Sequence, residues 1–258
     1  KYLEVATAQI DSMVALASCK GTLQYRMEAH GAGVLGSVLD GNFPAFPIAE
    51  QDCEDFAIYL GVKSGKQLSL PLRIAKRSTL REWSYKRDVF FAFYAGIMLV
   101  MLLYNLVLYF TVQDRSYLLY VFFLIGVAAS QLFLAGYQWA LPWWNPTSWL
   151  GVRSVHLIGV FSGVTTILFV NRFLDLARRG PGYYKVFNGL MSLYLVAVAC
   201  LIVGKLNWSY QIINLVAMAA LLVIPASLHV QRQGHRSARF LLTAFSFFIL
   251  TVVLFAFS

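Results

Sequence analysis

Long apolar intervals separated by short charged breaks dominate the last two thirds of the chain. From residue 89 onward, the intervals without Asp, Glu, Lys or Arg run for 25, 37, 18, 19, 26 and 19 residues. A helix needs about 20 mainly apolar residues to cross a bilayer, and it must satisfy its own backbone groups there. The pattern therefore predicts six membrane-crossing helices, near residues 89–112, 117–139, 153–171, 186–204, 209–230 and 239–258.

The break between the first two crossings is the short polar stretch QDRS, residues 113–116. Both of its flanks are apolar all the way round, which is unlike an amphipathic helix of a soluble protein. We interpret the stretch as the tight loop of a helical hairpin, held at one water interface. The 37-residue interval is too long for one crossing. It is interrupted at residues 141–146, where Pro and Asn favour a turn and Trp residues favour the headgroup region.

Residues 1–75 instead alternate apolar and polar positions, which is the pattern of half-buried β-strands. The two strongest runs are FAIYLGV and QLSLPLRI, and TLQYRME and YLEVATAQI are weaker candidates. Strands that follow one another without intervening helices favour a β-sandwich. The residues expected to share a face are Phe56, Ile58, Leu60 and Val62 in the first run, and Leu68, Leu70, Leu72 and Ile74 in the second.

The predicted fold class is therefore mixed: a partial extracytoplasmic β-sandwich followed by an α-helical transmembrane bundle. We expect the sandwich in residues 1–75, a basic connector in residues 76–88 and the bundle in residues 89–258. About 75 residues is short for a complete sandwich, so we expect that the chain begins inside a domain. Six crossings also return the chain to the side where it started, so we expect a seventh crossing after Ser258.

Composition and charge support a membrane protein and argue against a nucleic-acid-binding one. The chain is 59% hydrophobic and 13% charged, against about a quarter charged in soluble domains. Its net charge of +9 is unevenly spread: residues 1–72 carry −3, residues 73–88 carry +4, and the rest carries +8. The basic residues punctuate apolar runs instead of forming a patch, which is typical of membrane-flanking charge.

The distribution of Lys and Arg among the short loops predicts the orientation. The loops after the first, third and fifth crossings carry eight, and the other two loops carry two. The first set is therefore expected in the cytoplasm, and residues 1–88 outside. Six basic residues in 73–88 would erase this bias if they were counted. We discount them because an exported domain is committed to translocation before this segment emerges.

Several stretches resemble one family. The outer segment ends in FAIYLGVKSGKQLSLPLRI and is followed by FYAGIMLVMLLYNLVLYFTVQDRSYLLYVFFLIG, GYQWALPWW and FVNRFLDLARR. This sequence is similar to the bacterial seven-transmembrane receptors with diverse intracellular signalling modules. The resemblance implies a periplasmic jelly-roll domain that binds carbohydrate-like ligands, seven helices in the bacterial inner membrane, and a cytoplasmic output domain such as a diguanylate cyclase or a histidine kinase.

We therefore expect a transmembrane receptor that couples a periplasmic ligand to a cytoplasmic output. The alternative is a transporter or channel for a small solute, but no charged residue falls within the middle of a crossing and no inverted repeat is evident. No motif for a catalytic centre, a metal or a cofactor occurs. The expected partners are the lipid bilayer and an unidentified periplasmic ligand, with no nucleic acid.

Candidate site residues are few. Arg172 and Asp175, spaced i, i+3 at the inner end of the third crossing, form either a solvated interface pair or a switch toward the cytoplasm. Cys19 and Cys53 could form a disulfide, although two unpaired thiols are the plainer reading. Candidate helix-packing residues are Asn105, Gln131, Asn188 and Asn214, which can hydrogen-bond across helices, and Gly159 and Gly163, whose G-x-x-x-G spacing favours packing within the bundle and leaves a homodimer open.

Overall fold

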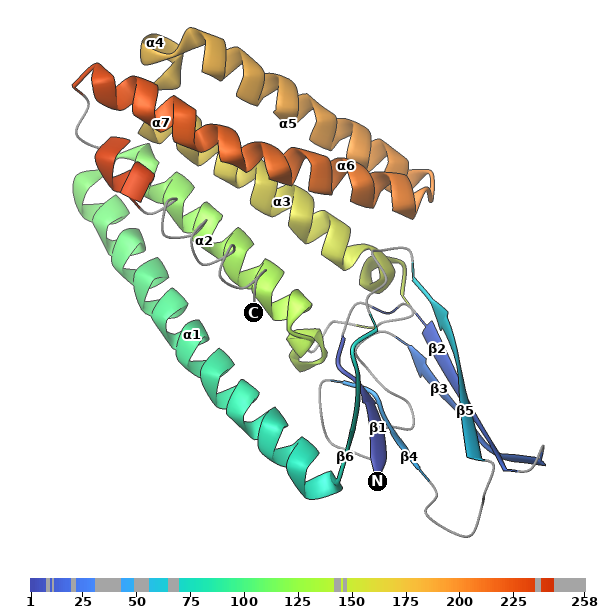
Figure 1. The fold of residues 1–258 in the computed structure, drawn as a ribbon. Helices are drawn as coiled ribbons and strands as arrows, with labels where there is room; N and C mark the ends of the chain where they lie inside the picture. The colour runs from blue at the N-terminus through green and yellow to red at the C-terminus, as the bar shows by residue number, and fades with distance from the viewer. Residues whose placement is uncertain are drawn as a thin grey trace. The chain divides into compact units, whose positions relative to one another are not determined.

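The computed structural model of the chain describes residues 1–7, 10, 12–19, 22–30, 43–48, 56–64, 70–141, 145, 148–234 and 238–243 (Figure 1). The chain divides into two compact units. The first comprises residues 1–100 and 128–155, and the second comprises residues 101–127 and 156–258. The strands belong to the first unit, and most of the helical bundle belongs to the second.

In the described residues of the first unit, the strands form two antiparallel sheets of three strands each. Val5 and Phe46 from one sheet share a buried core with Met13 and Ala15 from the other. This arrangement confirms the strand-rich start of the chain, while the jelly-roll connectivity stays a prediction. One sheet has the order β4-β1-β6, formed by Ala45–Pro47, Tyr2–Val5 and Leu72–Ala75; the other has the order β3-β2-β5, formed by Thr22–His30, Ser12–Cys19 and Phe56–Lys63.

The alternation of covered and exposed side chains predicted for β5 is present, and one face of the strand packs against the core. Leu60 pairs with Ala15, Val62 pairs with Met13, and both apolar side chains pack against the core. Tyr59, which precedes Leu60 on the opposite face of the strand, is 63% exposed. The strand β2 was not predicted, because its buried residues include the small Ala15 and Ala17, which give a weak hydrophobic signal.

The expected burial of the QLSLPLRI face is wrong for the part that the structure describes. Leu72 is 52% exposed and Ile74 is 62% exposed, and Leu70 also lies at the surface. These residues lie in or next to β6, which is an edge strand of its sheet among the described strands. The core reaches the neighbouring Val5 and does not extend across β6. Leu68 lies outside the described residues.

The cysteines also differ from the plainer reading of the sequence. Cys19, in β2, is disulfide-bonded, so it is not an unpaired thiol. Cys53, the pairing candidate named from the sequence, lies outside the described residues. Cys200, in the helix α5, is a free cysteine.

Residues 77–88, expected as a connector, are the first turns of the helix α1 (Arg77–Val112). The segment contains neither Pro nor Gly, so nothing in it interrupts a helix. At 1.5 Å per residue the helix is about 54 Å long, well beyond the roughly 30 Å of bilayer hydrocarbon. Leu80, only 2% exposed, packs against Ala45 with Tyr2 and Ala75 nearby. The helix is therefore continuous from a turn that touches the sheet to its apolar length.

Five helical segments in the described residues are long and apolar enough to cross a membrane. They correspond to the first five predicted crossings and confirm the helical second part of the chain (Figure 1). For the sixth, residues 238–243 are helical, and residues 244–258 lie outside the described part. The five segments are α1, α2 (Arg115–Leu134), α3 (Trp149–Phe173), α5 (Pro181–Ile202) and residues Leu206–Arg232; the short helices η1 (Tyr137–Ala140) and α4 (Leu176–Arg179) lie between them.

The fifth segment is not a uniform α-helix. It consists of α6 (Leu206–Met218), the 3-10 turn η2 (Ala219–Leu222) and α7 (Val223–Arg232). Pro225 has no N–H, so the carbonyl group of Leu221, four residues earlier, cannot receive an α-helical hydrogen bond. A 3-10 turn at this point uses the alternative i, i+3 pattern, and Pro225 thereby explains the irregularity.

The QDRS stretch forms a tight helical hairpin. α1 ends at Val112 and α2 begins at Arg115, so only Gln113 and Asp114 connect them. Gln113 adopts a left-handed conformation with φ 56°. The backbone N–H of Ser116 donates a hydrogen bond of 2.9 Å to Oδ1 of Asp114, which satisfies one of the free donors at the start of α2.

Candidate functional site

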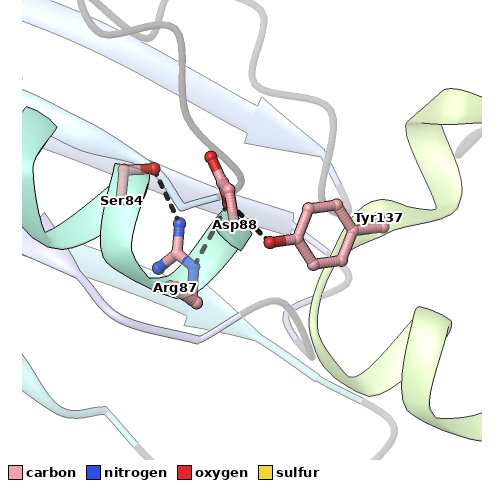
Figure 2. A network of polar contacts seen from close by, with 4 residues as sticks. All are labelled: Ser84, Arg87, Asp88 and Tyr137. Carbon is pink, nitrogen blue, oxygen red and sulfur yellow. Dashed lines mark hydrogen bonds and ion pairs between the residues drawn. The ribbon is translucent and has the colours of Figure 1, made fainter. Parts of the chain in front are cut away.

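A polar network forms where α1 leaves the β4-β1-β6 sheet. Arg87 donates a hydrogen bond of 3.0 Å to Oγ of Ser84, and its Nε lies 3.9 Å from Oδ1 of Asp88. The hydroxyl of Tyr137, in η1, donates a hydrogen bond of 2.5 Å to the same Asp88 oxygen (Figure 2). We call Glu4, Phe43, Arg87, Asp88 and Tyr137 the Arg87 junction.

Arg87 also faces the sheet side of this junction. Its guanidinium lies 4.1 Å from the centroid of the Phe43 ring, a distance at which a cation is attracted to an aromatic face. Glu4, in β1, is only 8% exposed. Burial raises the pKa of the Glu4 carboxyl, and the positive charges of Arg87 and then Arg73 oppose this rise. The charge of Arg87 thus favours the ionised form of this buried carboxyl group on the sheet.

Tyr137 holds the other side of the junction. Its ring stacks on Phe91 of α1 with centroids 4.1 Å apart and planes at 19°. Burial, and then the hydrogen bond to Asp88, raise the pKa of Tyr137 to about 12. The phenol is therefore protonated at neutral pH and is a steady donor to the Asp88 carboxylate.

Through Arg87 and Asp88, the junction connects three segments of the chain: strand β1, helix α1 and the turn that follows α2. Sequence reasoning assigned the charges of residues 73–88 to the bilayer surface and did not find this network. The Tyr137–Asp88 contact spans 49 residues, and no local pattern reveals such a pair. The available signal was the position of Arg87 and Asp88, the last charged residues before the 25-residue apolar interval.

The second unit contains a cavity of about 1250 Å³. Its lining comes from α1, α2, α3, α4, η2, the hairpin loop and residues 238–243. Charged and hydroxyl groups lie at the end near the α1–α2 hairpin, and aromatic rings line the walls. The polar residues of that end are Asp114, Ser116, Arg172, Asp175 and Arg178; the aromatic ones are Tyr117, Tyr120, Phe123, Phe169, Phe173 and Phe240.

The two predicted interface residues, Arg172 and Asp175, both line this cavity. Among the ion pairs of the described residues, none joins them. The expected i, i+3 pairing fails because α3 ends at Phe173, and Asp175 has a left-handed backbone with φ 48°. Arg172 instead acts on Asp114: hydrogen bonds from Ser116 are the main cause that lowers the pKa of the Asp114 carboxyl, and the charge of Arg172 adds to them.

The predicted amide residues divide by their partners. Asn188, in α5, accepts a hydrogen bond of 3.2 Å from Nδ2 of Asn171 in α3, so it does connect two helices. The Asn105 amide, which lines the cavity, donates to the carbonyl of Met101 in its own helix at 2.8 Å. Asn214 does the same with Tyr210, and Gln131 is exposed. Asn171 was not singled out from the sequence as the partner.

The small residues mark close helix contacts. A Cβ added at Gly163 would lie 1.9 Å from the Tyr194 hydroxyl oxygen, and one at Gly159 would lie 3.2 Å from Cγ2 of Ile213. Both glycines of the G-x-x-x-G pair therefore lie where α3 meets α5 and α6 of the same chain. Gly126, in α2, was not predicted, although a Cβ there would lie 2.8 Å from Cα of Ser162 in α3.

Comparison with known proteins identifies the helical region. Residues 87–258 match the family model described as 7TM diverse intracellular signalling. Neither the curated proteins nor the solved structures contain a match to the chain. The family match begins at Arg87, within the junction, and covers α1 from that residue onward together with every later element.

Proposed function

Because this chain belongs to the 7TM diverse intracellular signalling family, we propose that it is a receptor whose β-rich region senses a ligand outside the cytoplasm and whose helices pass the signal inward. The observation that carries the proposal is the family match over the helical region, with the Arg87 junction at its start. Through this junction, a change in the sheet would act directly on α1. A ligand shifts such a bundle only if it binds its two arrangements with different affinity.

The orientation belongs to the same proposal. It rests on the eight-to-two distribution of Lys and Arg among the short loops. Alkaline phosphatase fused after Asn145 is expected to be active, and fluorescent protein fused after Gly234 is expected to fluoresce, because these exposed positions belong to opposite loop sets. The reciprocal fusions are expected to be silent. Phosphatase activity from the Gly234 fusion instead would reverse the orientation.

The finer parts of the proposal are the ligand and the output. We expect a carbohydrate-like ligand at the periplasmic face of a bacterial inner membrane. The expected output is a change in cyclic di-GMP or in a phosphorelay, produced by a cytoplasmic diguanylate cyclase or histidine kinase module. Glycan array binding by the intact protein would name the ligand, and the cellular cyclic di-GMP level and the phosphorylation state would identify the output.

Deletion of residues 1–75 from the intact protein tests the receptor proposal. Because β6 and Leu80 hold the start of α1 against the sheet, the deletion is expected to change the basal output and abolish its response to ligand, while the helices still insert. Membrane fractionation checks insertion, and cyclic di-GMP and phosphorylation assays check the output. If these outputs stay unaltered while uptake of a solute collapses, the protein is a transporter and the proposal is wrong.

A further inference from the structure

We propose that the cavity of the second unit binds one anionic phospholipid, with its phosphate at Arg172 and Arg178 and an acyl chain along the aromatic wall. The proposal concerns the helical bundle and does not depend on what the β-rich region senses. It requires only that this end of the bundle lies at a bilayer surface, whichever side that is.

The cavity offers two arginine side chains that form no ion pair within the described part of the protein. Arg172 and Arg178 are exposed, line the cavity, and take part in none of the ion pairs found among the described residues. A guanidinium presents several donors in a planar fork that matches the oxygens of a phosphate. These two side chains can therefore hold a phosphodiester at the cavity mouth.

The same mouth also carries two carboxylates, Asp114 and Asp175. Asp114 already accepts the hydrogen bond from Ser116, and its negative charge is partly offset by Arg172. Over residues 113–116 and 171–185, five Lys or Arg residues face two Asp residues. The balance at this end of the bundle is therefore positive, and a basic pocket between helices favours an anionic headgroup.

The depth of the cavity matches one leaflet. Its lining runs along α2 from Ser116 to Val127, which corresponds to about 16 Å at 1.5 Å per residue. Half of a hydrocarbon core of roughly 30 Å is about 15 Å. A single acyl chain whose headgroup lies at the mouth would thus reach the far end of the cavity near the bilayer midplane.

The wall is chemically suited to such a chain. The ring of Phe169 lies 5.1 Å from that of Tyr120 and 5.6 Å from that of Phe123, measured between centroids, so the three rings form a continuous apolar surface. Two polar residues farther in, Asn105 and Thr166, donate their hydrogen bonds to carbonyl groups of their own helices. These bonds use the hydroxyl hydrogen of Thr166 and one of the two amide hydrogens of Asn105, so few polar donors are left to compete with an acyl chain in the inner cavity.

The test uses the intact protein in nanodiscs of phosphatidylcholine with stepwise additions of phosphatidylglycerol or phosphatidylethanolamine. Native mass spectrometry after transfer to detergent counts the lipids that stay bound. The wild-type protein is expected to retain one phosphatidylglycerol. R172Q/R178Q is expected to bind it about tenfold more weakly or worse, because two charge-assisted contacts are lost. R172K/R178K, which keeps both charges, is expected to retain it and shows that the site tolerates substitution.

Two further variants separate the headgroup from the chain. K185Q/R232Q removes two exposed charges that do not line the cavity, and it is expected to leave lipid retention unchanged. Thr166→Phe adds bulk to the wall and is expected to weaken lipid retention although both arginines remain. Inorganic phosphate, used as competitor, is expected not to displace the lipid, because it cannot fill the apolar wall.

Several results would overturn the proposal. Equal loss in both double variants would show a general charge effect, and equal retention of phosphatidylethanolamine would show that anionic charge is not recognised. Displacement by inorganic phosphate would reveal a plain anion site. A wild-type protein that retains no lipid at all would show that the cavity is not a phospholipid site.

Discussion

Gly126→Leu is expected to destabilise the helical unit by about 3 kcal/mol or more, because a side chain there has no space. A Cβ at this position would lie 2.8 Å from Cα of Ser162 and 3.3 Å from Oγ1 of Thr165. The nearest obstacle is backbone, so no side-chain rotation relieves the clash, and α2 must move away from α3. Helices in a membrane gain much of their association energy from such close packing of small residues.

The measurement is the fraction of detergent-solubilised protein that stays monodisperse after heating, followed by size-exclusion chromatography. Gly189→Leu is the matched control: it is also in an apolar helix, and a Cβ there meets nothing within 4 Å. This control is expected to match or exceed the wild-type stability, since Leu favours helix more than Gly does. Equal thermal midpoints for the two variants would refute the close contact between α2 and α3.

Arg87→Met is expected to destabilise the first unit by about 2 kcal/mol at neutral pH. The variant loses the contact of the guanidinium with the Phe43 ring and the hydrogen bond to Ser84. Two positive charges, Arg87 and Arg73, oppose the raised pKa of the Glu4 carboxyl, and Arg87 has the larger effect. The variant removes that charge. Limited proteolysis of residues 1–100 over a temperature series measures the effect. K86M, which removes an exposed neighbouring charge paired only with Glu82 among the described residues, is the control and is expected to cost little.

The pH dependence of this effect has a definite sign. Glu4 has a folded-state pKa raised above its usual 4.5. Below pH 4.5 the carboxyl is therefore protonated in both the folded and the unfolded chain and does not lower the stability of the folded unit. As the pH rises from 4.5 through the folded-state pKa, the unfolded chain ionises first, and the stability of the folded unit falls. Above the folded-state pKa the cost is constant. Arg87→Met raises this pKa further, so its defect is expected to shrink on acidification.

The double variant E4Q/R87M isolates this electrostatic part. Glutamine cannot ionise, so the double variant is expected to recover part of the stability that R87M alone loses, and to lose its pH dependence in this window. If E4Q/R87M is as unstable as R87M at every pH, Arg87 acts only through Phe43 and Ser84. The raised pKa of Glu4 would then not contribute to the junction.

The sequence by itself determined the features that depend on neighbouring residues. Five of the six predicted crossings correspond to apolar helices, because a charge-free interval of sufficient length is a local property that lipid enforces on each helix separately. The QDRS hairpin was predicted for the same reason, since its polar residues separate the first two of these intervals. The β-strand pattern around Leu60 and Val62 was equally local, because successive side chains of a strand point to opposite faces of the sheet.

Only the tertiary structure decided what those local features meet. The same period-2 alternation covers Leu60 and exposes Leu72 and Ile74, because periodicity marks a face as apolar and does not say whether another element lies over it. Charges that composition assigned to a bilayer surface instead build the Arg87 junction, since Asp88 meets a tyrosine 49 residues away. Likewise, Arg172 lies near Asp114 of the hairpin and not in an ion pair with Asp175, because α3 ends between Arg172 and Asp175. Contacts of this kind depend on where helices end and how they pack.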